Sequence, residues 1–149
     1  MTFRRADIND IEQLVQIRKV QLCDEGQKPD INIDEDLRRV YNEKMRTDDL
    51  IEWVAEDENG EMIATAAVLF MDFLPAFNNS AGKRGYITNV YTMDAYRRKG
   101  IARNLMQKLE DEALKHGVTH LVLHASEMGR KVYGKYGYRE THAVMEKHL

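Results

Sequence analysis

The chain has 149 residues, which lies within the usual size of one compact domain. With 43% hydrophobic and 32% charged residues, it can bury one core and keep a well-solvated surface. A net charge of −3 gives no general attraction to nucleic acid, and no segment approaches the ~18 consecutive apolar residues of a membrane span. The N-terminus lacks the apolar core of a signal peptide, and the single cysteine, Cys23, cannot form an internal disulfide. These features predict a cytoplasmic protein with one domain over residues 1–149.

The first half of the chain predicts two helices and three strands. Asp7 and Asp10 are cap-type residues ahead of the first helical pattern, and Gly26 and Pro29 interrupt the chain after it. The predicted elements are a strand at 1–5, helices at 11–23 and 34–45, and strands at 51–56 and 61–73. The last of these is almost continuously apolar, which predicts burial on both of its faces.

The second half predicts further strands alternating with helices. The expected elements are a loop at 74–84, a strand at 85–92, a helix at 101–115, a strand at 118–125, a helix at 129–136 and a last segment from 138 onward that closes the sheet. The helix at 101–115 is the clearest because its apolar residues form one stripe and Gly117 follows as a stop signal. This mixture of hairpins and crossovers predicts an α/β layered domain with a mixed sheet.

The most informative segment joins the strand that ends at Thr92 to the helix that begins at Ile101. The first turn of a helix leaves backbone N–H groups open, and Ser, Thr, Asp or Asn usually caps them. Here Arg98 and Lys99 occupy the cap region, and Gly100 allows the backbone to approach a ligand closely. A solvated basic turn is the alternative, but the strand before it and the amphipathic helix after it favour a site for an anion such as pyrophosphate.

Two motifs carry a resemblance to a known family. Arg97-x-x-Gly100-x-Ala102 matches the Q/R-x-x-G-x-G/A signature of the GCN5-related N-acetyltransferases, and the segment from Val132 to Tyr138 resembles that family's L-Y-x-K-x-G-F segment. The chain is similar to the family in pattern over nearly its whole length. The resemblance implies an acyl-CoA N-acyltransferase-like fold with a mostly antiparallel central sheet flanked by helices. It also implies acetyl-CoA as co-substrate, no metal, and acetyl transfer to a primary amine.

The resemblance also assigns residues to acetyl-CoA. Backbone groups of residues 90–92 would pair with the pantetheine arm, and the amides of residues 98–103 would hold the pyrophosphate, with basic side chains adding charge-assisted bonds. The assigned residues are Val90, Tyr91, Thr92, Arg97, Arg98, Lys99, Gly100, Ile101, Ala102, Arg103 and Ser126. Ser126 stands where many relatives carry Asn, so its shorter hydroxyl implies a weaker or water-bridged contact.

Acetyl transfer to an amine requires one proton to be given and another to be removed. Tyr133 matches the family's general acid, and a tyrosine with a pKa of about 10 is protonated at neutral pH. The base is open, because the strand at 85–92 contains no acidic residue. His124, Asp72 and a chain of water molecules are the candidates.

The acceptor is also open. A small-molecule or peptide amine is the leading hypothesis, and a non-catalytic acyl-CoA sensor and a protein- or tRNA-modifying acetyltransferase are the alternatives. Nucleic acid and membrane partners are not expected, and a homodimer stays open. The apolar loop at 73–77 is interpreted as a subunit contact, a lid or a wall of the acceptor pocket.

Overall fold

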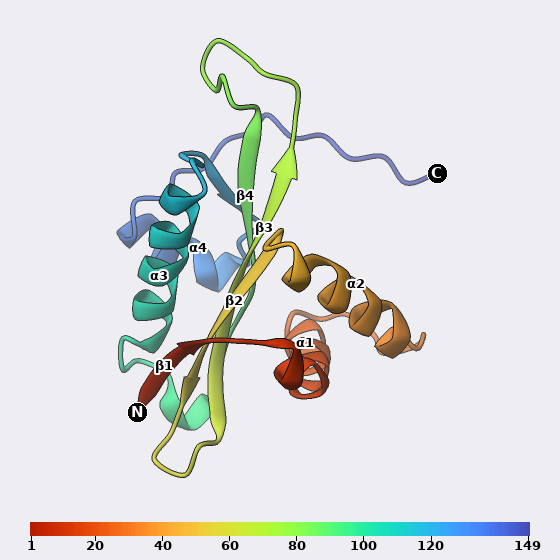
Figure 1. The fold of residues 1–149 in the computed structure, drawn as a ribbon, viewed down its shortest axis with the longest axis vertical. Coiled ribbons are helices and arrows are strands. Elements are labelled where there is room, and N and C mark those ends of the chain that lie inside the picture. The colour runs from red at the N-terminus through yellow and green to blue at the C-terminus, as the bar shows by residue number, and fades with distance from the viewer.

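The computed structural model describes residues 1–149 as one twisted sheet with helices on both faces (Figure 1). The strands are β1 (Thr2–Arg5), β2 (Leu50–Glu56), β3 (Met62–Asp72), β4 (Lys83–Thr92) and β5 (Leu121–Leu123). They lie in the order β1-β2-β3-β4-β5, and every neighbouring pair is antiparallel except β4 and β5, which are parallel. The mixed, mostly antiparallel sheet of the prediction is confirmed.

Four α-helices cover the sheet, two on each side of it in Figure 1. They are α1 (Ile11–Asp24), α2 (Asp34–Arg46), α3 (Ile101–Lys115) and α4 (Glu127–Lys135), together with the short 3₁₀ helices η1 (Ile8–Asp10) and η2 (Asp94–Tyr96). One apolar core joins the sheet to α3, and a second joins the opposite face to α1 and α2. No helix is long and apolar enough to cross a membrane.

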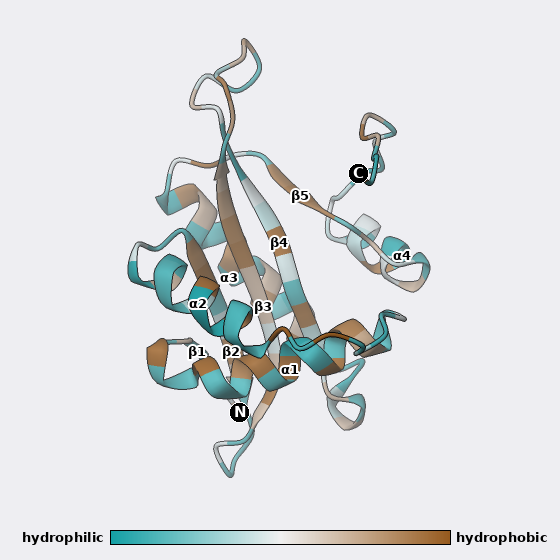
Figure 2. Cartoon of the chain, turned by 90° about the vertical axis from the view of Figure 1, so that its right-hand side faces the viewer, coloured by the Kyte–Doolittle hydropathy of each residue, from teal (hydrophilic) through white to brown (hydrophobic).

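The side-chain alternation of the central strands explains the two cores. Ile51 and Ala55 of β2 belong to the core under α3, whereas Leu50 and Val54 belong to the core under α1 and α2. β3 is buried along most of its length, as its continuous apolar run predicts, because helices cover both faces. In Figure 2 this strand is the most uniformly apolar part of the sheet.

The C-terminal segment differs from the prediction. Residues 138 onward were expected to close the sheet, but residues 137–149 contain no strand and β5 remains the last strand. The segment runs away from the domain in Figure 1, and Val144, Met145 and Leu149 are exposed. The predicted strand at 118–125 is likewise reduced to three residues, Leu121–Leu123, because only these pair with β4.

The apolar loop at 73–77 lies at the end of the β3–β4 hairpin and projects beyond the helices. Leu74 and Phe77 are exposed. Gly82 closes the loop with a left-handed φ of 68°, and a Cβ there would lie 2.3 Å from the carbonyl oxygen of Phe73, so only glycine fits. None of the residues 73–77 lines the cavity described below.

Candidate active site

A cavity of about 250 Å³ lies between α1 and the place where β4 and β5 separate. The two strands pair only from Gly85–Ile87 with Leu121–Leu123, and Figure 2 shows β5 diverging from β4 toward α4 beyond them. After Ile87, the edge of β4 that faces β5 therefore has no paired strand. The lining residues are Arg18, Gln21, Leu22, Glu25, Gln27, Tyr86, Ile87, Thr88, Asn89, Val90, Leu123, His124 and Tyr133.

A β-bulge turns β4 at this cavity. Ala67 pairs with Thr88 and Thr65 with Tyr91, so β4 contains one residue more than β3 between these pairs. Asn89 has a left-handed φ of 55°, which is uncommon for a residue other than glycine. The bulge directs the side chain of Asn89 toward α1 and α2. In a regular strand, Asn89 would lie on the same face as Ile87, which packs in the core under α3.

Asn89 is held by a buried polar network. Its Nδ2 donates to Tyr41 Oη at 2.6 Å and to Glu52 Oε2 at 3.2 Å, while its carbonyl accepts from Thr65 Oγ1 at 2.7 Å. Glu52 is only 1% exposed, and burial raises its pKa to about 7 despite the opposing hydrogen bonds. A buried carboxyl group without an ion-pair partner is costly, and its hydrogen bond from Asn89 ties it to the bulge.

The start of α3 is open, as the sequence predicts. Gly100 is the N-cap with a left-handed φ of 78°, no side chain caps the helix, and the first turn has no acidic residue. The other helices differ: η1 has a capping box from Asp7, Glu12 and Asp34 lie in the first turns of α1 and α2, and Ser126 caps α4. The start of α3 therefore keeps its N–H groups and positive dipole end available for an external anion.

The basic side chains of this turn have separate roles. Arg97 is engaged within the protein, since its Nε donates to the carbonyl of Thr92 at 2.9 Å and its Nη1 pairs with Asp94 at 2.9 Å. Lys99 Nζ lies 5.2 Å from the ring centroid of Tyr96. Arg98 has a left-handed φ of 62° that shapes the turn. Arg97 thus joins the end of β4 to the segment that leads to α3.

Tyr133 lies in the cavity on α4. Its ring packs edge-on against Tyr136 and Tyr138, with centroid distances of 6.4 Å and 6.0 Å. A Cβ at Gly129 would lie 3.0 Å from this ring, so the small residue makes room for it. Burial raises the pKa of Tyr133, which keeps its hydroxyl protonated at neutral pH.

Ser126 and the base candidates occupy different places. Ser126 Oγ accepts from Gly129 N at 3.1 Å, so this hydroxyl caps α4. His124 lines the cavity, and its Nδ1 lies 2.8 Å from Tyr86 Oη. Asp72 does not line it, because it ends β3 next to the exposed loop and faces Lys83 at 3.8 Å. The structure therefore brings Tyr133 and His124 together but leaves Asp72 apart.

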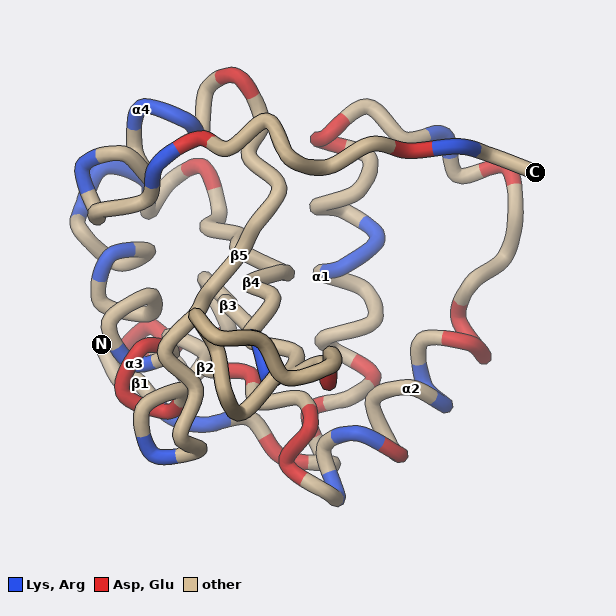
Figure 3. Tube along the Cα trace, turned by 90° about the horizontal axis from the view of Figure 1, so that it is seen from above, with Lys and Arg blue, Asp and Glu red and all other residues tan.

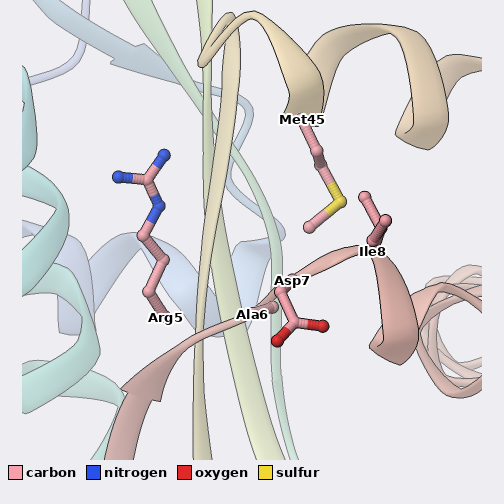
Figure 4. Close-up of a pocket in the computed structure, with 5 residues that line it drawn as sticks. All are labelled: Arg5, Ala6, Asp7, Ile8 and Met45. Atoms are coloured by element: carbon pink, nitrogen blue, oxygen red, sulfur yellow. The ribbon is translucent and has the colours of Figure 1, made fainter.

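A second cavity, of about 320 Å³, lies between the end of β1 and the end of α2 (Figure 4). It is lined by Arg5, Ala6, Asp7, Ile8 and Met45, and Arg5 forms an ion pair with Asp48. None of its lining residues comes from β4, β5, α3 or α4. It contains neither a tyrosine nor a histidine, whereas the first cavity contains Tyr133 and His124, so the first cavity is the candidate active site.

Three cavity-associated features were missed by the sequence interpretation. The only sequence signal for Glu52 is that an acidic residue stands within an apolar strand. No local pattern predicts the bulge at Asn89. Arg18 has ordinary helical spacing and no motif around it. These residues join the site only through contacts between elements distant in sequence.

A layered α/β domain in which β4 and β5 separate and an uncapped, basic helix start follows β4 is suited to bind an anionic ligand. The sequence profile of the Acetyltransferase (GNAT) family matches residues 14–138. The chain therefore belongs to this family of N-acetyltransferases, which use acetyl-CoA as the acetyl donor. The predicted family, fold, enzyme class and co-substrate are confirmed.

Solved structures agree with this assignment. A predicted acetyltransferase from Clostridium acetobutylicum, solved with acetyl-CoA, is 45% identical, with a TM-score of 0.96 over 99% of this chain and 96% of that one. A GCN5-related N-acetyltransferase from Ralstonia eutropha JMP134 is 26% identical, with a TM-score of 0.90 over 99% and 97%. Glucosamine-6-phosphate N-acetyltransferase from Arabidopsis thaliana, at 24% identity and a TM-score of 0.74 over 100% and 99%, shares the fold. No curated protein matches the chain.

Proposed function

We propose that this chain transfers the acetyl group of acetyl-CoA to the primary amine of a small molecule, with Tyr133 as general acid. The observation that carries this proposal is the position of Tyr133 in the cavity where β4 and β5 separate. When bound, acetyl-CoA supplies a thioester whose C–S bond breaks as the amine forms a C–N bond. Tyr133 holds a proton for the departing sulfur, and its raised pKa keeps that proton in place until then.

The amine must also lose a proton to complete the transfer. His124 is the cavity residue best suited to accept it, directly or through water, because Tyr86 Oη holds its imidazole at 2.8 Å. A cavity of about 250 Å³ accommodates a small amine. A homodimer stays a prediction, favoured by the exposed apolar residues of the C-terminal segment.

The residues at the start of α3 fit the pyrophosphate of acetyl-CoA. Open N–H groups of Ile101, Ala102 and Arg103 would hold its oxygens, and Lys99 would add positive charge nearby. On β4, the open edge at residues 90–92 would receive the pantetheine arm, although the Thr92 carbonyl already accepts a bond from Arg97. These roles are part of the proposal.

The proposal predicts that purified protein releases CoA from acetyl-CoA in the presence of primary amines, with a stoichiometric mass gain on the amine. A panel of small amines, a lysine-containing peptide and bulk tRNA separates the acceptor classes by mass spectrometry. Release of CoA with small amines alone supports the proposal. Acetyl-CoA binding without any acetylated product would instead favour the sensor hypothesis.

Ala102→Glu should weaken acetyl-CoA binding by about tenfold or more, because its carboxylate would satisfy the helix start and repel the pyrophosphate. The helix itself should be no less stable, since an acid in the first turn is favourable. Isothermal titration calorimetry measures the affinity and a thermal melt the stability. Gln107→Glu adds the same charge to an exposed position of α3, and should bind like the wild type. If both variants bind acetyl-CoA equally weakly, the start of α3 is excluded from the binding site.

A further inference from the structure

One wall of the cavity is formed by one face of α1 together with Glu25, which follows the helix. Arg18, Gln21, Leu22 and Glu25 line the cavity, and their spacing of three, four and seven residues places them on one helical face. Arg18 Nη1 donates to Gln21 Oε1 at 3.0 Å, and Gln21 Nε2 donates to Glu25 Oε1 at 3.1 Å. The wall therefore presents a cation at one end, a carboxylate at the other and an amide between them.

The cation of this wall has no ion-pair partner. Arg18 lies within 4.0 Å of no carboxylate, whereas its neighbour Lys19 pairs with Asp34 of α2 at 3.0 Å. Figure 3 shows the short basic segment formed by these two residues in the middle of α1, on the side of the sheet where β4 and β5 lie. A guanidinium that lines a cavity without a carboxylate partner is well suited to bind a carboxylate or a phosphate of a ligand.

Both charged ends of the wall belong to the cavity that Tyr86 and Tyr133 also line. Burial raises the pKa of Tyr133, and the negative charge of Glu25 adds to the rise. Burial also raises the pKa of Tyr86, and there Arg18 opposes the rise whereas Glu25 adds to it. The wall therefore offers a ligand one positive and one negative group within a single cavity.

We propose that the acetyl acceptor is a primary amine that also carries an anionic group, with its ammonium near Glu25 and Tyr133 and its carboxylate or phosphate on Arg18. This inference rests on the proposed function and adds the class of the acceptor to it. Glu25 attracts the cationic amine before it loses its proton, and Arg18 fixes the other end so that the nitrogen is directed toward the thioester. Gln21 accepts a hydrogen bond from Arg18 and donates one to Glu25, so it lies between the two charged side chains.

The test compares acceptors with and without an anionic group. O-phosphoethanolamine is paired with ethanolamine, and alanine with alaninamide, so the two pairs separate phosphate from carboxylate. Wild-type protein should use the anionic member of at least one pair with about tenfold or greater kcat/KM, as one charge-assisted contact implies. Arg18→Gln should remove this preference mainly by raising KM for the anionic amine, and Arg18→Lys should restore part of it.

Lys19→Gln is the matched control. It removes one positive charge from the adjacent position, but Lys19 faces Asp34 of α2 and is absent from the cavity lining, so the preference should persist. Equal use of anionic and neutral amines by the wild type would overturn the inference while leaving the proposed function intact. A preference that survives Arg18→Gln would overturn it as well.

Calorimetry provides a readout that does not depend on turnover. With CoA present, O-phosphoethanolamine or alanine should bind the wild type more tightly than its neutral partner, and Arg18→Gln should abolish the difference. Equal binding of all four amines would contradict the inference even if acetylation proceeds. Selective binding of an anionic amine without turnover would support the inference and count against acetyl transfer, so the two failures are distinguishable.

Discussion

Tyr133→Phe should lower kcat for acetyl transfer by about 10²- to 10⁴-fold, while the dissociation constant of acetyl-CoA stays nearly unchanged. The substitution removes only the hydroxyl that would protonate the departing sulfur. It keeps the ring that packs against Tyr136 and Tyr138, so the shape of the cavity and the stability of α4 are preserved. Steady-state kinetics with a saturating amine measures kcat, and calorimetry measures cofactor binding.

Tyr136→Phe is the matched control for this prediction. Tyr136 lies on the same side of the domain and packs against Tyr133, but it does not line the cavity. Its loss of a hydroxyl should leave kcat close to the wild-type value. Turnover that is unaffected by Tyr133→Phe would exclude the hydroxyl as the acid, and a comparable loss in both variants would point to packing instead of proton transfer.

Glu52→Gln should remove a pH dependence of stability that the wild type shows between about pH 5 and pH 8. Burial raises the pKa of Glu52 from 4.5 to about 7, so in this range the unfolded chain carries the charge more readily than the folded one. The folded state then binds more protons, and the free energy of unfolding falls as the pH rises. The shift corresponds to about 2–3 kcal/mol across this range, or roughly 5–10 °C in Tm.

Thermal melts of the wild type and Glu52→Gln at pH 5, 6, 7 and 8 measure this difference. The wild type should lose stability relative to the variant as the pH rises, with the steepest change between the ordinary pKa of 4.5 and the raised pKa of about 7. Glu58→Gln, in the exposed turn after β2, removes one acidic group without changing a buried site and should follow the wild type. Parallel curves for the wild type and Glu52→Gln would show that Glu52 titrates normally.

Glu52 matters for function because it holds Asn89 in the bulge of β4. The side chain of Asn89 satisfies the buried carboxylate and Tyr41 Oη together, while its backbone changes the direction of the strand at the cavity. Removing the carboxylate would free one of these bonds and weaken the constraint on a left-handed residue. The position of the β4 edge proposed to receive acetyl-CoA therefore depends on a residue two strands away.

Much of this organisation could be predicted from local sequence. The continuous apolar run of β3, the amphipathic stripe of α3 and the absence of a cap before Ile101 each depend on a few neighbouring residues. These signals indicated the layered fold and the open start of α3, and two spaced motifs indicated the family. They succeeded because helix starts and side-chain periodicity are local properties of the chain.

Other features required the tertiary structure. The segment from 138 onward has apolar residues, but a strand needs a partner, and β5 presents only three paired residues. Asp72 and His124 looked equivalent as base candidates at strand ends, yet only His124 reaches the cavity, since β3 and β5 end at different places. Long-range pairing decided both outcomes.

The sequence by itself determined that α3 begins without a cap beside basic residues, because these features are encoded within one short segment. Only the tertiary structure brought Arg18, Glu25 and Tyr133 around one cavity and placed Glu52 behind Asn89. The physical reason is that helix capping acts over neighbouring residues, whereas a cavity and a buried network arise where distant elements pack together.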